Sequence, residues 1–315
     1  MQTRTLGHSG IELTTVGLGT WAIGGGDWAF AWGPQDDALS AKTIHAALDA
    51  GINWIDTAPV YGLGHAEEVV GAALRERSDC PFVATKCGRV WDDQGRVGNG
   101  LGAASVRVEC EDSLRRLGVD VIDLYQIHWP IPDEQVEEAW QTVAELIEEG
   151  KVRFGGVSNF SVSQLERAMR IHPVTSLQPP YSMFERTVED GALAFCEQHD
   201  IGVVAYSPMQ KGLLTGKVTL EWMRALPMDD HRRRDPMFRG PRLAELLGRV
   251  DQLKQVADRL GVPLSQLAIA WVLRRSEVTS AIVGARRPGQ ILETFPAMNV
   301  ELALSDLDEI AGILE

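Results

Sequence analysis

The chain has 315 residues, of which 44% are hydrophobic and 23% charged, as is ordinary for a soluble globular protein. Its formal net charge of -14 argues against a general nucleic-acid binder, which needs a basic face to displace counterions. No run approaches the roughly 18 apolar residues of a membrane span, and the start lacks an apolar signal core, so no membrane association is expected.

The chain opens with two short alternating runs that flank residues 7–10, Gly-His-Ser-Gly. This pattern predicts a β-hairpin, which could close the N-terminal end of a barrel. Eight apolar runs with little period-2 alternation then predict parallel strands covered on both faces. These runs are 14–19, 53–58, 82–87, 123–128, 153–158, 175–179, 202–207 and 280–284.

Helical patterns lie between the runs, with Ser, Asp or Pro near their starts and Gly after several ends. The clearest are 40–51, 66–77, 105–118, 132–150, 161–170 and 188–200. Eight strands alternating with helices favour a closed (β/α)8 TIM barrel, and no linker or repeat divides residues 1–315 into further domains. An open doubly wound sheet is the alternative fold.

The segment 210–242 has no clear strand and is predicted to form a long loop after strand seven. Long loops inside compact domains are usually functional. Its basic run, Arg232 to Arg234, is interpreted as a solvated turn, with phosphorylated-substrate binding as a weaker alternative.

Four polar residues stand at or just beyond the ends of three predicted strands. Asp56 and Tyr61 occur in NWIDTAPVYG, Lys86 in PFVATKCG and His128 in LYQIHWP. The C-terminal strand ends of a barrel carry its active site, so these groups are expected to meet there. An acid, a base and a phenol in one pocket can transfer a proton to a carbonyl oxygen.

The lysine is expected to make the phenol a better acid. A free tyrosine has a pKa of about 10. One cation at about 4 Å is worth about 4 kcal/mol at an effective dielectric of 20. Lowering a pKa by two units takes about 2.7 kcal/mol, so Lys86 alone suffices. Asp56 would hold Lys86, and His128 would orient the carbonyl oxygen. The alternative is purely structural: a buried Asp–Lys pair, a packed Tyr and a satisfied His.

The motifs WIDTAPVYGLGHAEEVVGAAL, VATKCG, DLYQIHWP, GKVRFGGVSNFS and IVGARRPGQ resemble the aldo-keto reductases. The stretches GLGTWAIGG and QPPYSMFERTVE…AYSPMQKGLLTGK most resemble the bacterial general-purpose branch of that family. The resemblance runs from about Thr5 to Leu314. It implies a (β/α)8 barrel, an NADP(H) cofactor bound without a Rossmann fold, and a catalytic tetrad in which Tyr61 matches the general acid. The tetrad positions are Asp56, Tyr61, Lys86 and His128.

The resemblance also implies cofactor-binding positions along the chain. Asp56 is one of them, and the nicotinamide end would meet Gly19, Thr20, Trp21, Ser158, Asn159, Gln178 and Tyr206. The pyrophosphate would be covered by Ser207, Pro208, Gly212, Leu214 and Lys217. The adenosine and 2'-phosphate would meet Gly284, Arg286, Gln290 and Glu293. The family commonly has asparagine where this chain has Thr294, which weakens the expected adenine contact.

The residues themselves support a phosphate site after strand eight. Arg286 and Arg287 precede a helical pattern there, and barrels often bind phosphate after strands seven and eight. Arginine can bond a 2'-phosphate bidentately, which favours NADP over NAD. A G-x-G-x-x-A match at 17–22 runs into three glycines instead of a helix, so it is not read as a Rossmann fingerprint.

The pocket beside the cofactor is expected to be apolar, with Trp21 and Trp129 contacting substrate. No metal site is expected, because the histidines and cysteines lack ligand spacing. The cysteines also lack close pairing, which favours reduced thiols and a cytoplasmic location.

The predicted function is NADPH-dependent reduction of aldehydes, ketones or sugar carbonyls to alcohols. One alternative is an NADP(H)-binding regulatory or redox-sensing subunit with slow turnover, as in family members attached to membrane channels. Another is an unrelated barrel hydrolase or isomerase. The expected partner is a small carbonyl compound, and the sequence does not give the physiological substrate or the oligomeric state.

Overall fold

A computed structural model describes residues 1–315 and forms a closed barrel of eight parallel strands. Strands that follow one another in the chain are neighbours in the barrel, and the last pairs with the first. The strands are β3 (Val16–Gly19), β4 (Trp54–Asp56), β5 (Phe82–Cys87), β6 (Ile122–Ile127), β7 (Val152–Ser158), β8 (Ser176–Gln178), β9 (Gly202–Tyr206) and β10 (Val278–Gly284). The (β/α)8 prediction is therefore confirmed, and the open-sheet alternative is wrong.

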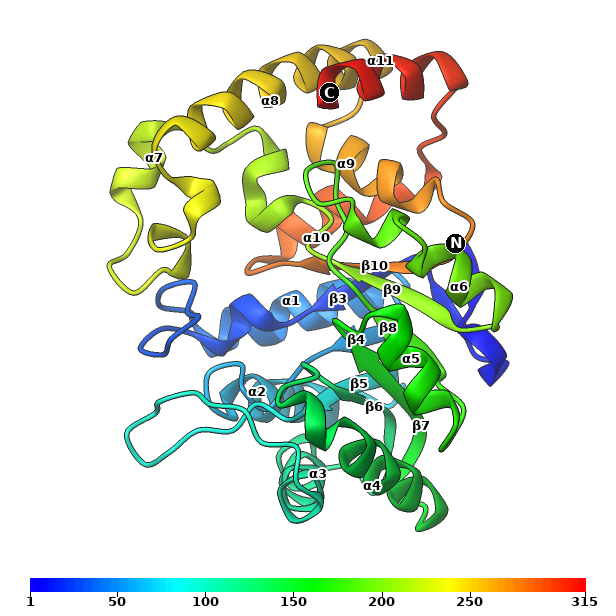
Figure 1. The fold of residues 1–315 in the computed structure, drawn as a ribbon. Coiled ribbons are helices and arrows are strands. Elements are labelled where there is room, and N and C mark those ends of the chain that lie inside the picture. Colours follow the sequence, from blue (N-terminus) through cyan, green and yellow to red (C-terminus); the bar gives the residue numbers. More distant parts are fainter.

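Helices surround this barrel, and α8 and α11 lie together outside it (Figure 1). No single helix is long and apolar enough to cross a membrane; α8 and α9 reach that length and composition only as a pair bent by 89°. The helices are α1 (Asp37–Asp49), α2 (His65–Arg75), α3 (Ala103–Leu117), α4 (Val136–Glu148), α5 (Val162–Met169), α6 (Ala192–Gln198), α7 (Leu220–Ala225), α8 (Gly240–Leu260), α9 (Leu264–Leu273), α10 (Pro288–Thr294) and α11 (Leu304–Leu314).

Two predicted helices begin later than their sequence patterns suggest. The pattern at 132–150 starts as a 3-10 turn, Asp133–Gln135, before α4. The pattern at 188–200 is split between a 3-10 turn, Thr187–Glu189, and α6. Gly191 between them has a φ of 107°, a left-handed conformation that a continuous right-handed helix cannot contain.

The N-terminal hairpin closes one end of the barrel, as predicted. Strand β1 (Thr3–Thr5) pairs antiparallel with β2 (Glu12–Thr14). The buried side chains of Leu6 and Leu13 pack with Trp54 and other residues of the barrel interior. Burial of these leucines excludes water from the end of the barrel opposite the strand ends that carry the predicted site.

The barrel interior changes from apolar to polar along its axis. At the hairpin end Trp54 fills the space, and its Nε1 donates to the carbonyl of Thr14 at 3.2 Å and to Ser280 Oγ at 3.1 Å. Gly17 faces this ring, and a Cβ there would lie 2.0 Å from Trp54 Cε2. Two residues further along β4, Asp56 occupies the same inner face, because alternate residues of a strand share a face.

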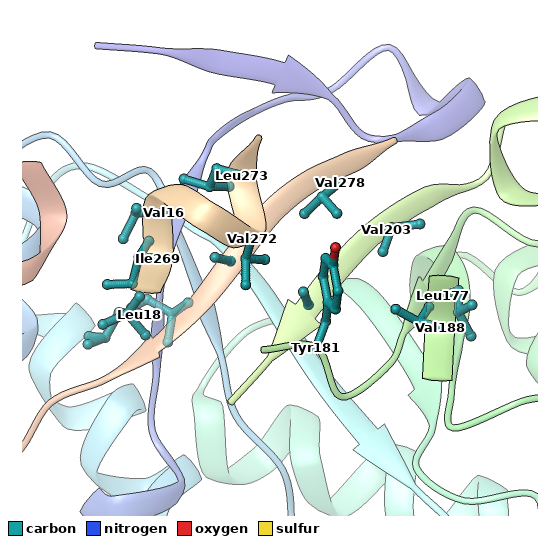
Figure 2. Packing of buried hydrophobic residues seen from close by; sticks show 14 of the residues in the cluster. Val16, Leu18, Leu177, Tyr181, Val188, Val203, Ile269, Val272, Leu273 and Val278 are labelled. Carbon is teal, nitrogen blue, oxygen red and sulfur yellow. The ribbon is translucent and has the colours of Figure 1, made fainter. Parts of the chain in front are cut away.

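The outer core lies between the strands and the surrounding helices. Every residue of α9 except Gln266 is buried, which accounts for its nearly continuous apolar sequence. Figure 2 shows Ile269 and Val272 of this helix close to Val16 and Leu18 of β3. This packing fixes the wall of the barrel from outside and leaves the inner face of each strand for the site.

The segment predicted as a long loop after the seventh barrel strand is partly helical. It contains α7 and 3-10 turns at Gln210–Thr215, His231–Arg233 and Pro236–Phe238, and α8 begins at Gly240. The interpretation of its basic run as solvated is wrong for Arg232. The guanidinium bonds Asp230, with Nη2–Oδ2 at 2.6 Å, and lies over the rings of Trp32 and Trp222. An ion pair and two aromatic faces replace the lost water.

Candidate active site

The four polar residues predicted to form the site meet at the C-terminal rim of the barrel. Lys86 on β5 lies between Asp56 on β4 and Tyr61 in the following loop. Its Nζ donates to Asp56 Oδ1 at 2.7 Å, to the Thr57 carbonyl at 2.8 Å and to Tyr61 Oη at 3.3 Å. The ring of Tyr61 lies 5.8 Å from that of His128 in an edge-to-face arrangement.

The Lys86–Asp56 ion pair is buried and has further polar partners. Lys86 is 0% exposed and Asp56 2% exposed. The other carboxylate oxygen of Asp56 accepts from Gln178 Nε2 at 2.8 Å and from Gln126 Nε2 at 3.4 Å. These contacts satisfy both oxygens of the acid, so the orientation of Lys86 toward the phenol is fixed.

The pKa of Tyr61 is not lowered as expected. Burial and the negative charge of Asp56 raise the pKa of Tyr61 well above its usual value. The phenol lies beside a neutralised ion pair rather than beside an isolated cation, because Asp56 is 2.7 Å from Lys86. The phenol therefore stays protonated at neutral pH and holds a proton that it can donate.

His128 follows β6 and is neutral. Burial, with the positive charges of Lys86 and Arg89, lowers the pKa of His128 well below its usual value. Its Nδ1 is buried and has no hydrogen-bond partner. Its carbonyl accepts from Asn159 Nδ2 at 2.9 Å, which ties the ends of β6 and β7 together. A neutral imidazole beside a phenol can orient a carbonyl oxygen by hydrogen bonding.

A cavity of about 1510 Å³ opens over these residues. It is larger than the roughly 300–1,000 Å³ of usual small-molecule sites. Trp21 and Trp129 line it, and the ring of Trp21 stacks on Tyr61 at 6.3 Å. Besides these, the predicted site residues that line it are Gly19, Asp56, Tyr61, His128, Ser158, Asn159, Gln178, Tyr206, Ser207, Pro208, Lys217, Gly284, Arg286, Gln290 and Glu293, together with Thr294.

Three predicted cofactor-binding residues do not line this cavity. Thr20 is 0% exposed, and its hydroxyl donates to the Asp56 carbonyl at 3.1 Å. Leu214 is buried in the outer core. Gly212 adopts a φ of 93° within the turn that contains it. A role of these three residues in cofactor binding stays a prediction.

The wall carries the polar groups that a dinucleotide requires. Two residues predicted to meet the nicotinamide end are held by a hydrogen bond, with Tyr206 Oη donating to Asn159 Oδ1 at 2.9 Å. Seven basic and four acidic side chains line the cavity, although the whole chain is acidic. A Cβ on Gly284 would meet nothing within 4 Å, so the backbone there is open to a ligand. The volume and the basic wall fit a bound nicotinamide dinucleotide.

Arg286 is not free in this structure. Its Nε donates to Gln35 Oε1 at 2.8 Å, its Nη1 to the Trp32 carbonyl at 3.0 Å, and its Nη2 to the Pro34 carbonyl. Burial lowers its pKa. Two of its five N–H groups remain available, and the neighbouring Arg287 makes no ion pair.

Several cavity residues were not predicted from the sequence, among them Phe30, Gln35, Arg89, Lys211 and His231. Arg89 follows Lys86 by three residues, so a charged side chain directly after a strand end was its available signal. His231 comes from the basic run, and its Nδ1 lies 3.1 Å from the Ala31 carbonyl. The local sequence around His231 carries no signal for its contact with Ala31, which lies 200 positions earlier in the chain.

Comparison with known proteins gives consistent results. The model of the Aldo/keto reductase family matches residues 15–315. "Aldo-keto reductase YhdN" of Bacillus subtilis is 40% identical over 100% of this chain and 94% of its own length. The "NADH-specific methylglyoxal reductase" of Escherichia coli is 35% identical over 98% of both chains. The structure of the glycerol dehydrogenase AKR11B4 from Gluconobacter oxydans has a TM-score of 0.90 at 41% identity, covering 99% of this chain and 94% of that one.

Proposed function

Because the chain belongs to the aldo/keto reductase family, we propose that it reduces aldehydes or ketones to alcohols with a nicotinamide cofactor, and that Tyr61 is the general acid. The observation that carries the proposal is the contact of Lys86 with both Asp56 and Tyr61 at the floor of the cavity. A structural ion pair alone would not need a phenol at 3.3 Å from the ammonium and open to a cavity.

Each residue has a separate task in this proposal. Tyr61 donates its proton to the carbonyl oxygen as negative charge develops there, and Lys86 stabilises the phenolate that is left. Asp56 keeps Lys86 charged, since burial by itself lowers the pKa of that lysine. His128, being neutral, donates a hydrogen bond that positions the carbonyl oxygen beside Tyr61.

When bound, NAD(P)H supplies the hydride for the carbonyl carbon. Asn159, Gln178 and Tyr206 would hold its nicotinamide end, and Arg286 and Arg287 its phosphates. Lys86 and Asp56 are buried from water, which strengthens the electrostatic contribution of Lys86.

Conversion of Tyr61 to Phe tests the assignment of the general acid. The substitution removes the proton donor and keeps the ring that stacks on Trp21. The expected result is a loss of kcat of about 100-fold or more, the usual contribution of general acid catalysis, with nearly unchanged quenching of tryptophan fluorescence by NADPH. Retention of more than a tenth of the wild-type rate would show that another group donates the proton.

We propose a preference for NADPH over NADH, since Arg286 and Arg287 lie together at one wall of the cavity. The Escherichia coli relative named for NADH specificity makes a direct measurement necessary. Arg286→Ala and Arg287→Ala should each raise the KM for NADPH much more than the KM for NADH. Equal increases in the KM values for NADPH and NADH would show that these arginines do not bind the 2'-phosphate.

A regulatory or redox-sensing subunit with slow turnover is the second candidate, and rates of NADPH oxidation with aldehydes decide between the two. Steady-state turnover near the usual 1–10³ s⁻¹ supports an enzyme, whereas tight NADPH binding without turnover supports the subunit. Free thiols at all four cysteines favour a reducing compartment, and we place the protein in the cytoplasm on that basis.

A further inference from the structure

We propose that Arg89 binds an anionic group of the substrate, so that the preferred substrates are carbonyl compounds bearing a carboxylate or a phosphate. This inference rests on the proposed function, since it places a second substrate group in the same cavity. Nothing in the Asp56–Tyr61–Lys86–His128 tetrad itself requires a charged substrate.

Arg89 lies in the wall of the reaction chamber. It follows β5 by two residues and lines the cavity together with Tyr61, His128 and Trp129. Its positive charge is one of the causes that lower the pKa of His128, so its field reaches the proposed carbonyl site. An anion bound at Arg89 would therefore belong to the same small molecule as a carbonyl bound at Tyr61.

The position of this arginine is fixed by its surroundings. The chain turns at Gly88, whose φ is 87° and whose N–H donates to Glu109 Oε2 at 2.9 Å. Arg89 Nη1 then donates to Asn99 Oδ1 at 2.6 Å, and the guanidinium lies 5.4 Å from the ring centroid of Phe30. The Nε and Nη2 groups make no hydrogen bond and remain available for a planar bidentate contact with carboxylate or phosphate oxygens.

The absence of a counter-charge distinguishes Arg89 from three other basic residues of the cavity. It is partly buried, burial lowers its pKa, and no carboxylate forms an ion pair with it. The paired cavity cations are Lys211 with Asp235, Lys217 with Glu293 and Arg232 with Asp230. Removing a charge from water without a partner costs free energy, and a bound anion would recover it.

The remaining unpaired arginines of the cavity lie elsewhere on its wall. Arg286 and Arg287 follow β10 and are assigned to the cofactor phosphates, and Arg234 donates to the Ala29 carbonyl. Arg89 is thus the unpaired cation beside His128. In a chain of net charge -14 with 44 acidic residues, a wall that keeps such a cation free of carboxylates is suited to an anionic ligand.

The test compares matched anionic and neutral aldehydes. One pair is 4-oxobutanoate and its methyl ester, which differ in the carboxylate charge; the other is glyceraldehyde 3-phosphate and glyceraldehyde. Charge-assisted hydrogen bonds contribute about 1.5–3 kcal/mol, so kcat/KM should favour at least one anion over its neutral partner by about tenfold or more. The pair that shows the preference identifies carboxylate or phosphate as the preferred group.

In Arg89→Gln this preference should fall to near unity, mostly through a higher KM for the anion. Arg89→Lys keeps the charge and should retain part of the preference. Arg153→Gln is the matched control, because Arg153 also lies over a phenylalanine ring, at 5.2 Å from Phe154, but does not line the cavity. It removes the same charge and should leave the ratio at its wild-type value. Thermal unfolding of each variant verifies that it is folded.

The inference is overturned if wild-type protein turns over both members of each pair with equal kcat/KM, or if Arg89→Gln keeps the wild-type ratio. Binding separates this failure from failure of the proposed function. Suppose that 4-oxobutanoate and glyceraldehyde 3-phosphate quench tryptophan fluorescence in wild type but not in Arg89→Gln, and that no aldehyde is turned over. The anion site at Arg89 would then be supported, and the proposed reductase function would be wrong.

Discussion

Replacement of Lys86 by methionine separates a catalytic ion pair from a structural one. Lys86 is fully buried and donates to Asp56, to the Thr57 carbonyl and to Tyr61. Methionine is of similar length but cannot carry charge. The variant leaves the carboxylate of Asp56 buried with only the amide donors of Gln178 and Gln126.

Breaking a buried ion pair by removing one partner costs about 3–5 kcal/mol, because the other charge stays buried. The double variant Asp56→Asn, Lys86→Met has no such charge and should recover most of that loss. For a domain of this size the single variant should unfold on the order of 5–10 °C lower than wild type. Reductase activity should be lost in Lys86→Met and stay lost in the double variant, since neither contains an ammonium beside Tyr61.

The assay is a double-mutant cycle on Asp56 and Lys86, with unfolding followed by tryptophan fluorescence and turnover followed by NADPH oxidation. A Lys86→Met variant destabilised by less than about 1 kcal/mol would refute the argument from burial. A double variant that regained turnover would show that the pair is structural and that Lys86 takes no part in catalysis.

Two further predictions concern stability. Burial raises the pKa of Glu109 from 4.5 to about 7, so the folded state binds this proton more tightly and stability falls as pH rises from about 4.5 to 7. Glu109→Gln should therefore have a free energy of unfolding up to about 3 kcal/mol higher than wild type at pH 8 and lose that advantage near pH 5. A Tm difference between the two that does not depend on pH would contradict this. Gly17→Ala should destabilise by about 1–3 kcal/mol or more, because its Cβ would lie 2.0 Å from the Trp54 ring, and the smaller ring of Trp54→Phe should rescue it. Gly248→Ala lies in an exposed part of α8, where an added Cβ would meet nothing within 4 Å, so it should instead stabilise by about 0.5–1 kcal/mol. Thermal unfolding of Gly17→Ala, of Gly17→Ala with Trp54→Phe, and of Gly248→Ala checks these expectations.

The strand ends were predictable because their signal is local. An apolar run that stops on Asp56, Lys86 or His128 marks both the strand and the rim at which it ends. Parallel order then brings these ends together without further information, since neighbouring strands of a barrel end on the same face. The hairpin was predictable for the same reason, from the glycines between two alternating runs.

The charge state of the site was not predictable from residue types. The sequence indicated a lysine near a tyrosine, and from that alone the phenol should be more acidic. The structure places Asp56 as close to Lys86 as a hydrogen bond allows, buries both and leaves the phenol only partly exposed, and the pKa of Tyr61 rises instead of falling. Electrostatic effects of buried groups depend on distances and exposure, which a linear pattern does not contain.

The sequence by itself therefore determined the eight strands, their order and the four residues at their rim, because hydrophobic periodicity and strand ends act over a few neighbouring residues. Only the tertiary structure decided which loops line the cavity and that Arg286 donates a hydrogen bond to Gln35. It also decided that Arg232 is buried in an ion pair while Arg89 has no counter-charge. These outcomes depend on contacts between segments up to about 250 positions apart, whose free energies come from packing and desolvation in three dimensions.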